Sequence, residues 1–355
     1  MSKSKDISEL DENFKVTESK DGLEWYDIRS LAVEGLAWQD TKSPFDRLPA
    51  KAEGVVREPV WSLQQHSAGV CVRFQSDAES ISARWNLINE NLQMGHMPSS
   101  GVSGLDLYVW HNEEWQWLAV GVPTGKENDK QLIAGIEKGM HSFMLYLPLY
   151  NGVSQVEIGL PKGAKLQADD KQLESKPVCF YGTSILHGGC ASRPGLAYPS
   201  IISRRLNIPH YNLGFSGNAH LDLEVAELLA ELDPCLFVID ALPNNGPERI
   251  IERFEKFIHI LRKSHKQTPI LCIENIRYQQ SPMLQNKRGA WFDKNVAHKT
   301  CFDRLIADGV TNLHYLSAHT LLGSDGEATV DGTHPNDLGF MRMADAIQPY
   351  VDALR

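Results

Sequence analysis

The chain has 355 residues, of which 42% are hydrophobic, 23% charged and 8% aromatic, and its formal net charge is −10. This length exceeds one typical hydrophobic core and suits two domains, and the composition is that of an ordinary globular protein. The acidic balance and the scattered basic residues argue against nucleic acid as a partner and against a polybasic membrane-binding segment.

The first residues, MSKSKDISELDENFKV, are polar and acidic and show no apolar core of a signal peptide. No stretch approaches the roughly eighteen apolar residues that a membrane span needs. The six cysteines form no CxxC pair, and three of them lie inside apolar runs, as expected in a reducing compartment. We therefore expect a cytoplasmic protein without a membrane partner.

The first half of the chain, from about residue 25 to residue 160, predicts many short β-strands. Apolar and polar residues alternate with period two over residues 69–76, 80–87, 104–110, 115–121, 141–150 and 154–160. Turn-forming clusters such as MPSSGVSG and PTGKEN separate these stretches. Short strands at regular spacing indicate an all-β sandwich or jelly roll, which we assign to residues 1–172.

The pattern changes from Lys176 onward. The preceding stretch, PKGAKLQADDKQLESKP, is charged and poor in apolar residues, which predicts a connector. After it, continuous apolar runs (PVCFYG, CLFVID, PILCIEN, NLHYLS) alternate with helical patterns over residues 197–206, 221–231, 247–264, 288–308 and 337–354. Apolar strands that alternate with helices indicate a parallel sheet covered on both faces. We assign this α/β domain to residues 173–355.

The first strand of the second domain ends in Gly182-Thr183-Ser184. Ligands bind at the carboxyl ends of the strands in open α/β sheets, and a helix start offers unpaired N–H groups for an oxyanion. Ser184 is therefore a candidate nucleophile. A serine at this place is more often only the N-cap of a helix, so this stretch alone is weak evidence.

A serine nucleophile needs a histidine base and a group that orients it. Asp331 and His334 lie three residues apart in VDGTHPND, although an Asp-Gly turn and a helix cap would explain this stretch equally well. Gly217 in NLGFSGNA and Asn244 in IDALPNN follow the next two strands and could donate hydrogen bonds to an oxyanion. All four stretches fall at carboxyl ends of predicted strands, and this coincidence favours a site.

Together these stretches resemble the SGNH (GDSL-type) hydrolase superfamily. The nucleophilic serine of that family matches Ser184 in YGTSI, and its block II glycine matches Gly217 in GFSGN. The block III asparagine matches Asn244 in LPNN. The Asp-x-x-His motif matches Asp331 and His334 in DGTHP. The resemblance implies a flavodoxin-like, three-layer α/β/α fold with a five-stranded parallel sheet.

Two departures and one further match refine the resemblance. Thr183 stands where the better-known motif has aspartate, and the usual Gly-x-Asn-Asp wording is absent. GLDLY, residues 104–108, matches the Gly-x-Asp-Leu-Tyr motif of a subgroup in which a β-sandwich precedes the hydrolase domain. The architecture is also similar to that of bimodular carbohydrate esterases.

The resemblance implies a serine esterase with a Ser184-His334-Asp331 triad and an oxyanion hole formed by Ser184, Gly217 and Asn244. We expect a small acyl ester as substrate, preferably an acetyl ester on a sugar. An acyltransferase would use the same residues, and a non-catalytic carbohydrate-binding protein is the alternative from another class. The sequence leaves the oligomeric state open.

No cofactor and no metal are expected. The chain has no His-Glu-x-x-His motif and no paired Cys/His spacing. GTSILHGG lacks the lysine of a phosphate-binding loop and the G-x-G-x-x-G spacing of a dinucleotide-binding turn.

Overall fold

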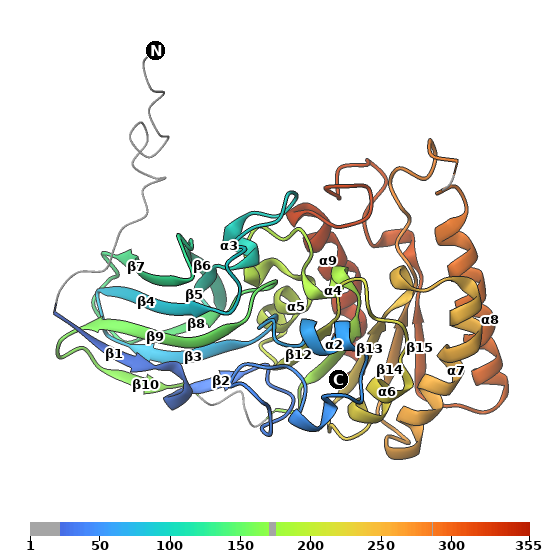
Figure 1. Ribbon diagram of the computed structural model, residues 1–355, viewed down its shortest axis with the longest axis horizontal. Coiled ribbons are helices and arrows are strands. Elements are labelled where there is room, and N and C mark those ends of the chain that lie inside the picture. Colours follow the sequence, from blue (N-terminus) through green and yellow to red (C-terminus); the bar gives the residue numbers. More distant parts are fainter. Residues whose placement is uncertain (1–21, 170–174, 286) are drawn as a thin grey trace, which may run out of the picture.

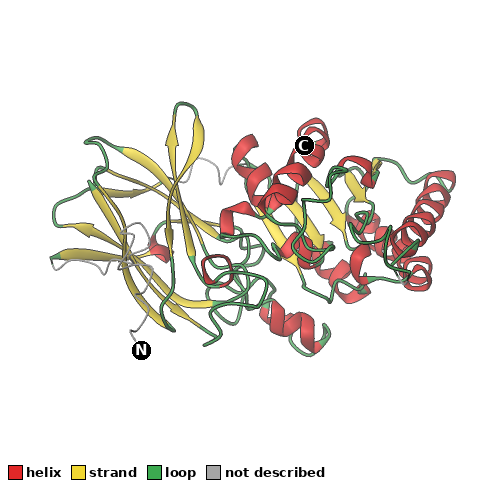
Figure 2. Cartoon of the chain, turned by 90° about the horizontal axis from the view of Figure 1, so that it is seen from above, coloured by secondary structure: helices red, strands yellow, loops and turns green. Residues whose placement is uncertain are grey.

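The structure, a computed structural model, describes residues 22–169, 175–285 and 287–355 (Figure 1). An antiparallel β-sandwich forms the N-terminal part, and a parallel sheet enclosed by helices forms the C-terminal part (Figure 2). The predicted boundary between residues 172 and 173 lies outside the described residues, as does the polar and acidic N-terminal stretch, residues 1–16.

Two antiparallel sheets form the sandwich. The first has the order β1-β9-β4-β7, with β1 (Leu23–Asp27), β9 (Val153–Pro161), β4 (Ser80–Leu87) and β7 (Glu127–Ala134). The second has the order β10-β3-β8-β5-β6, and β2 pairs with β3. Its strands are β10 (Leu166–Ala168), β3 (Cys71–Ser76), β8 (His141–Tyr146), β5 (Leu105–His111), β6 (Glu114–Gly121) and β2 (Ala32–Glu34). The predicted sandwich is confirmed.

Alternation of apolar residues fails to predict four of these strands. β7 has the sequence ENDKQLIA and lies at the edge of its sheet, and part of it was expected to be a turn. β10 lies at an edge as well, inside the segment expected to be a connector. β1 and β2 are short. Short or polar edge strands are common because their backbone pairs with one neighbour and their side chains face water.

The predicted strand over residues 141–150 is too long. β8 ends at Tyr146, and Pro148 follows two residues later. Proline has no N–H to donate to a neighbouring strand, so the chain leaves the sheet here. Leu149 and Tyr150 then lie in a loop that reaches the second domain.

The parallel sheet has the strand order β12-β11-β13-β14-β15. Its strands are β11 (Val178–Gly182), β12 (His210–Gly214), β13 (Leu236–Asp240), β14 (Ile270–Ile273) and β15 (Leu313–Leu316). The order 2-1-3-4-5 is that of flavodoxin-like folds. The predicted five-stranded α/β/α fold is confirmed.

Helices cover both faces of this sheet. α5 (Tyr198–Leu206) and α9 (Asp337–Leu354) pack on one face, and α6 (Leu223–Leu229), α7 (Pro247–Ser264) and α8 (Ala290–Ala307) pack on the other. Short helices are α2 (Glu58–Leu63), α3 (Ser99–Val102) and α4 (Ser184–His187), and the 3-10 turns are η2 (Ile28–Ser30), η3 (Ala50–Ala52), η5 (Pro194–Leu196), η6 (Leu242–Asn244) and η7 (Ala318–Thr320). Among the described helices, none is both long and apolar enough to cross a membrane.

All five predicted helices are present, and two of them, α7 and α9, have the predicted bounds. α6 starts at Leu223 rather than at Leu221, because Leu221 has a φ of +52° and Asp222 is the N-cap.

The packing of β11 explains why its sequence is apolar without alternation. Cys179 and Tyr181 belong to the core beneath α6–α8, and Val178 and Phe180 belong to the core beneath α5 and α9. Both faces of the strand are buried.

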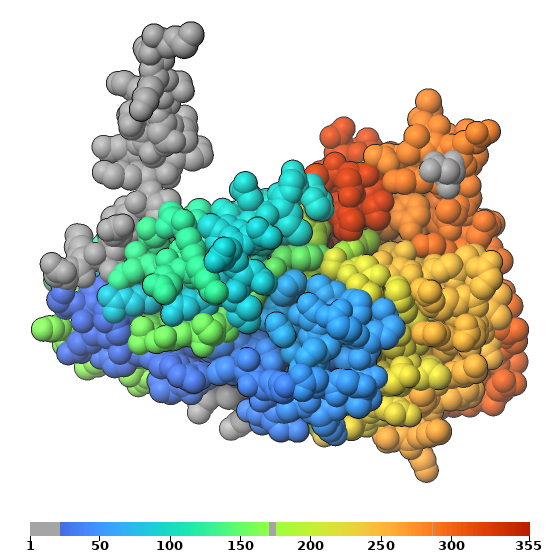
Figure 3. Space-filling model, viewed as in Figure 1, coloured from blue at the N-terminus to red at the C-terminus, as the bar shows by residue number. Residues whose placement is uncertain are grey.

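A segment of the N-terminal half completes the core of the second domain. Trp38, Leu48, Ala52, Val56 and Val60 belong to the same apolar cluster as β11, α6 and α7. This stretch, in blue, lies against the yellow part of the chain on the surface shown in Figure 3. The two halves are therefore joined by a shared hydrophobic core.

Arg47 connects this segment to the end of β12. Its side chain is 1% exposed, and its guanidinium donates to the backbone oxygens of Leu63, His66, Asn212 and Gly214 at 2.7 to 2.9 Å. Burial lowers the pKa of Arg47 to about 9. A lysine could not reach four acceptors in one plane, so the fork geometry of arginine is required here.

The GLDLY motif forms a second contact between the domains. Asp106 is fully buried in β5 and accepts hydrogen bonds from Arg193 (3.1 Å), from the N–H of Gly195 (2.8 Å) and from the Trp117 indole (3.0 Å). Arg193 also donates to the Tyr108 hydroxyl at 2.6 Å. The motif thus holds the loop that follows α4.

Asp240, at the end of β13, is a buried carboxyl group that should make the stability of the folded protein depend on pH. It is 3% exposed, and burial raises its pKa to about 7 despite a hydrogen bond from Tyr198 (3.0 Å). An unfolded aspartate titrates near roughly 3.9. Because the pKa is raised in the folded state, the protonated carboxyl of Asp240 contributes to the free energy of unfolding. This contribution is complete below about pH 4 and is lost as the pH rises through about 7.

We expect Asp240→Asn to remove this loss, because asparagine cannot ionise. The free energy of unfolding of the variant, relative to the unchanged protein, should increase by a few kcal/mol from about pH 4 to about pH 8. Urea unfolding at a series of pH values measures this difference. Parallel stability curves for the two proteins would contradict the prediction.

Candidate active site

The candidate site begins where β11, β12 and β13 end side by side. Gly182 is in register with Gly214 on one side and with Asp240 on the other. A Cβ atom on Gly214 would lie 2.4 Å from the backbone nitrogen of His187, and one on Gly182 would lie 2.4 Å from the carbonyl oxygen of Asp240. Glycine at both positions lets α4 pack directly on the strand ends.

Ser184 is the first residue of α4, but it is not the N-cap. Thr183 is the N-cap, and its hydroxyl accepts from the N–H of Ile185 at 3.4 Å. The capping function that would have explained a serine here is thus supplied by its neighbour. The Ser184 hydroxyl instead forms a 2.8 Å hydrogen bond with Nε2 of His334.

His334 lies in the loop before α9, held by Asp331. Its Nδ1 is 2.7 Å from Oδ2 of Asp331, and Oδ1 accepts from the N–H groups of His334 (2.7 Å) and Thr333 (2.9 Å). Partial burial raises the pKa of Asp331, but these hydrogen bonds outweigh it and hold the pKa at about 2. The carboxylate is therefore ionised and accepts from Nδ1–H, which leaves Nε2 as the acceptor facing Ser184.

The expected Asp-Gly turn is also present, since Gly332 has a φ of +84°. The turn and the hydrogen-bonded Ser184-His334-Asp331 row are thus compatible. The structure brings together all three side chains that the sequence singled out as a triad.

Gly217 and Asn244 lie on the loops after β12 and β13. Gly217 is exposed, and a Cβ atom there would meet no other atom within 4 Å. Glycine is favoured at this position because the backbone has a φ of +69°. Asn244 accepts through Oδ1 from the N–H of Ala219 at 3.3 Å, which ties its loop to that of Gly217. With Oδ1 engaged, the NH₂ group of Asn244 is the part available as a donor.

Sequence reasoning missed Tyr150, which comes from the sandwich domain. Its hydroxyl lies 3.3 Å from the carbonyl oxygen of Ser184 and 3.2 Å from Oγ of Ser216. Its ring stacks on His187 with 4.2 Å between centroids. His187 is buried, and burial together with the charge of Arg47 lowers its pKa well below the usual value, so a neutral ring donates to the oxygen of Leu149 at 2.7 Å.

The sandwich contributes a second element, the loop between β4 and α3 together with α3 itself. Ser100 donates through its hydroxyl to the carbonyl oxygen of Ser192 at 2.7 Å, and Gly101 lies so close to Ala191 that a Cβ would meet its oxygen at 2.2 Å. The ring of His96, in the loop before α3, is 6.0 Å from that of His334. For Tyr150, the sequence held one signal: Pro148 marks the point where the chain leaves β8, so the residues after it lie in a loop.

Residues 175–352 match the GDSL-like Lipase/Acylhydrolase family, and residues 23–166 match the N-terminus of Esterase_SGNH_hydro-type. The chain belongs to the GDSL-like lipase/acylhydrolase family. It is therefore an ester hydrolase by family, and the resemblance noted in both halves of the sequence is confirmed.

Three solved structures of similar fold cover between 81% and 95% of this GDSL-like hydrolase. A protein described as a GDSL-like lipase from Bacteroides ovatus is 33% identical, with a TM-score of 0.90 over 94% of this chain and 98% of that one. The salicylyl-acyltransferase SsfX3 of a tetracycline biosynthetic pathway is 20% identical (TM-score 0.74; 95% and 98% covered). A family two carbohydrate esterase from Clostridium thermocellum is 14% identical (TM-score 0.60; 81% and 92% covered). No curated protein matches the sequence.

Tyr150→Phe should lower kcat about five- to tenfold and leave KM nearly unchanged. The variant loses one hydroxyl that orders the loops of Ser184 and Ser216, and a hydrogen bond of this kind contributes about 1 kcal/mol. Steady-state kinetics on an aryl acetate, with thermal unfolding in parallel, measures both effects.

Tyr211→Phe, in the amino half of β12, is the matched control and should keep full activity. A rise in KM alone, or equal losses in both variants, would exclude this positioning role for Tyr150.

Proposed function

We propose that this GDSL-like hydrolase is a serine esterase that cleaves small O-acyl esters through an acyl-enzyme. The observation that carries the proposal is the continuous row from Ser184 Oγ to His334 Nε2 (2.8 Å) and from His334 Nδ1 to Asp331 (2.7 Å). A serine hydroxyl in contact with an oriented imidazole is the arrangement that serine hydrolases use.

In the proposed reaction, Ser184 Oγ attacks the acyl carbonyl carbon while His334 Nε2 takes the hydroxyl proton. The N–H groups of Ser184 and Gly217 and the NH₂ group of Asn244 donate to the developing oxyanion. The intermediate collapses, and His334 gives the proton to the leaving alcohol. A water molecule, deprotonated by His334, then releases the acid and restores Ser184. Asp331 stays ionised throughout and holds the imidazole.

We propose an acetyl group on a carbohydrate as the substrate. A cavity of about 230 Å³ lies beside the His334 loop and includes Glu274, Arg277, Gln279, Trp291 and His319 in its lining. Gln279 donates from its backbone to the oxygen of Gly332, so the cavity adjoins the triad loop. Trp291 offers a ring face on which a pyranose can stack, and Glu274, Arg277 and Gln279 offer hydrogen-bonding groups for its hydroxyls. The family two carbohydrate esterases of similar fold agree with this choice.

Acyl transfer is the second candidate function. The same residues would form the acyl-enzyme, and a bound alcohol would replace water in the second step. The fold shared with a salicylyl-acyltransferase is the observation that favours it. A non-catalytic carbohydrate-binding protein is disfavoured by the intact hydrogen-bonded row at Ser184.

Ser184→Ala should abolish ester hydrolysis, with a loss of at least about a thousandfold in kcat, because no acyl-enzyme can form. The side chain is small and Thr183 caps the helix, so circular dichroism and the unfolding temperature should stay close to those of the unchanged protein. Hydrolysis of p-nitrophenyl acetate measures the loss. A variant that retains most of its activity would end the serine-nucleophile proposal.

The length of the acyl chain should matter steeply. We expect kcat/KM to fall from acetyl to butyryl to octanoyl p-nitrophenyl esters, because the loops at the strand ends carry no long apolar run that could line an acyl tunnel. Adding an acceptor sugar and counting free acetic acid separates hydrolysis from transfer. Preference for octanoyl would refute the acetyl proposal, and acid formation that falls as the acylated sugar accumulates would establish the transferase.

A further inference from the structure

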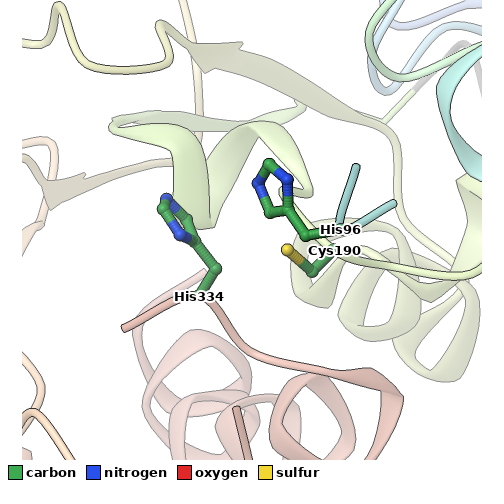
Figure 4. Close-up of side chains that lie close together, drawn as sticks. All are labelled: His96, Cys190 and His334. Carbon is green, nitrogen blue, oxygen red and sulfur yellow. The ribbon is translucent and has the colours of Figure 1, made fainter. Parts of the chain in front are cut away.

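Three side chains with metal-binding atoms gather at the mouth of the candidate active site: His96, Cys190 and His334 (Figure 4). Their ligand atoms lie within 4.8 Å of one another. They come from three separate segments, namely the loop between β4 and α3, the loop after α4 and the loop before α9. The sulfur of Cys190 points towards the space between the two imidazole rings (Figure 4).

His334 can offer only one of its nitrogens. Nδ1 is engaged by Asp331 at 2.7 Å, so the nitrogen open to a metal is Nε2, which also faces Ser184. A histidine whose second nitrogen is held by a carboxylate is the usual form of a metal-binding histidine, because the carboxylate fixes the ring and increases its basicity.

Cys190 is held in place within the site. It is 5% exposed, and its φ of +78° is a conformation that residues other than glycine rarely adopt. Its Sγ is one of the ligand atoms that lie within 4.8 Å of one another, so the constrained backbone holds the sulfur beside the two imidazoles.

His96 stands at the tip of a tight turn. Met94 and Met97 flank it and exchange backbone hydrogen bonds of 3.0 and 3.2 Å, and Met97 is 2% exposed in the core of the second domain. The turn is thus anchored while the imidazole itself is exposed and can rotate about its side-chain bonds.

We propose that His96, Cys190 and Nε2 of His334 form a binding site for Zn²⁺ or a similar soft divalent ion. Zinc binds nitrogen at about 2.0 Å and sulfur at about 2.3 Å in tetrahedral geometry, which separates ligand atoms by about 3.3 to 3.6 Å. The ligand atoms are at most 4.8 Å apart, so closure requires a shift of at most about 1.5 Å, within reach of the exposed His96 ring. The thiol proton goes to solvent, and a water molecule takes the fourth position.

Binding makes the metal an inhibitor. The lone pair of Nε2 that bonds the metal is the one that would accept the Ser184 proton, so the metal-bound protein cannot activate its nucleophile. This consequence rests on the proposed esterase function, whereas metal binding itself does not. Thiolate and imidazole ligands select zinc and cobalt over magnesium and calcium.

The test uses the full chain after treatment with a chelator. Titration with Co²⁺ should give a sulfur-to-cobalt charge-transfer band that saturates at one ion per chain and is displaced by Zn²⁺. Zn²⁺ should inhibit p-nitrophenyl acetate hydrolysis, EDTA should reverse the inhibition, and Mg²⁺ should have no effect.

Two variants locate the site, and two others serve as matched controls. Cys190→Ser should abolish the cobalt band, and both Cys190→Ser and His96→Gln should need about 10- to 100-fold more Zn²⁺ for half-inhibition. Cys235→Ser, before β13 at the opposite end of the sheet, and His111→Gln, at the end of β5, should behave like the unchanged protein.

The outcomes distinguish the two proposals. Unchanged zinc sensitivity in Cys190→Ser and His96→Gln, or no cobalt–sulfur band, would overturn the metal site even if the esterase is active. A cobalt band that depends on Cys190 in a protein without esterase activity would support the metal site and overturn the proposed function instead.

Discussion

The candidate site depends on one constraint: β11, β12 and β13 all end at the same level of the parallel sheet. Gly182, Gly214 and Asp240 are neighbours in register, so the loops that carry Ser184, Gly217 and Asn244 start from one edge. A slip of one strand by a single residue would turn every buried side chain to the opposite face of the sheet. The apolar packing on both faces of β11 therefore also fixes the relative positions of the polar groups at its end.

The sequence predicts most of the elements that bury apolar side chains and few of those that do not. α7 and α9 have the predicted bounds because Pro247 and the N-cap Asn336 mark their starts and an apolar stripe follows. β7 and β10 escape prediction because edge strands need only backbone pairing to one neighbour. The sequence therefore predicts an element well when the element packs an apolar face into the core, and poorly when it lies at the edge of a sheet.

The sequence singled out Ser184, His334 and Asp331, which the structure brings together, because their motifs are local; it did not single out the residues that support them. Tyr150 and His96 reach the site through contacts between segments that are far apart in the chain. Arg193 is held by Asp106 of the sandwich, and that contact orients the loop after α4. The sandwich thus contributes residues beside the candidate site, and this contribution depends on tertiary packing rather than on a local motif.

The shared core has a consequence for the order in which the molecule assembles. Trp38, Leu48 and Val60 pack against strands and helices that begin only at Val178. On a ribosome these apolar side chains wait on the order of tens of seconds for partners that are still to be synthesised. The nascent N-terminal half therefore exposes an apolar surface that is prone to aggregation until a chaperone or the second half covers it. A chain cut between the halves would yield two fragments, each with an open apolar face, whose tendency is to find one another.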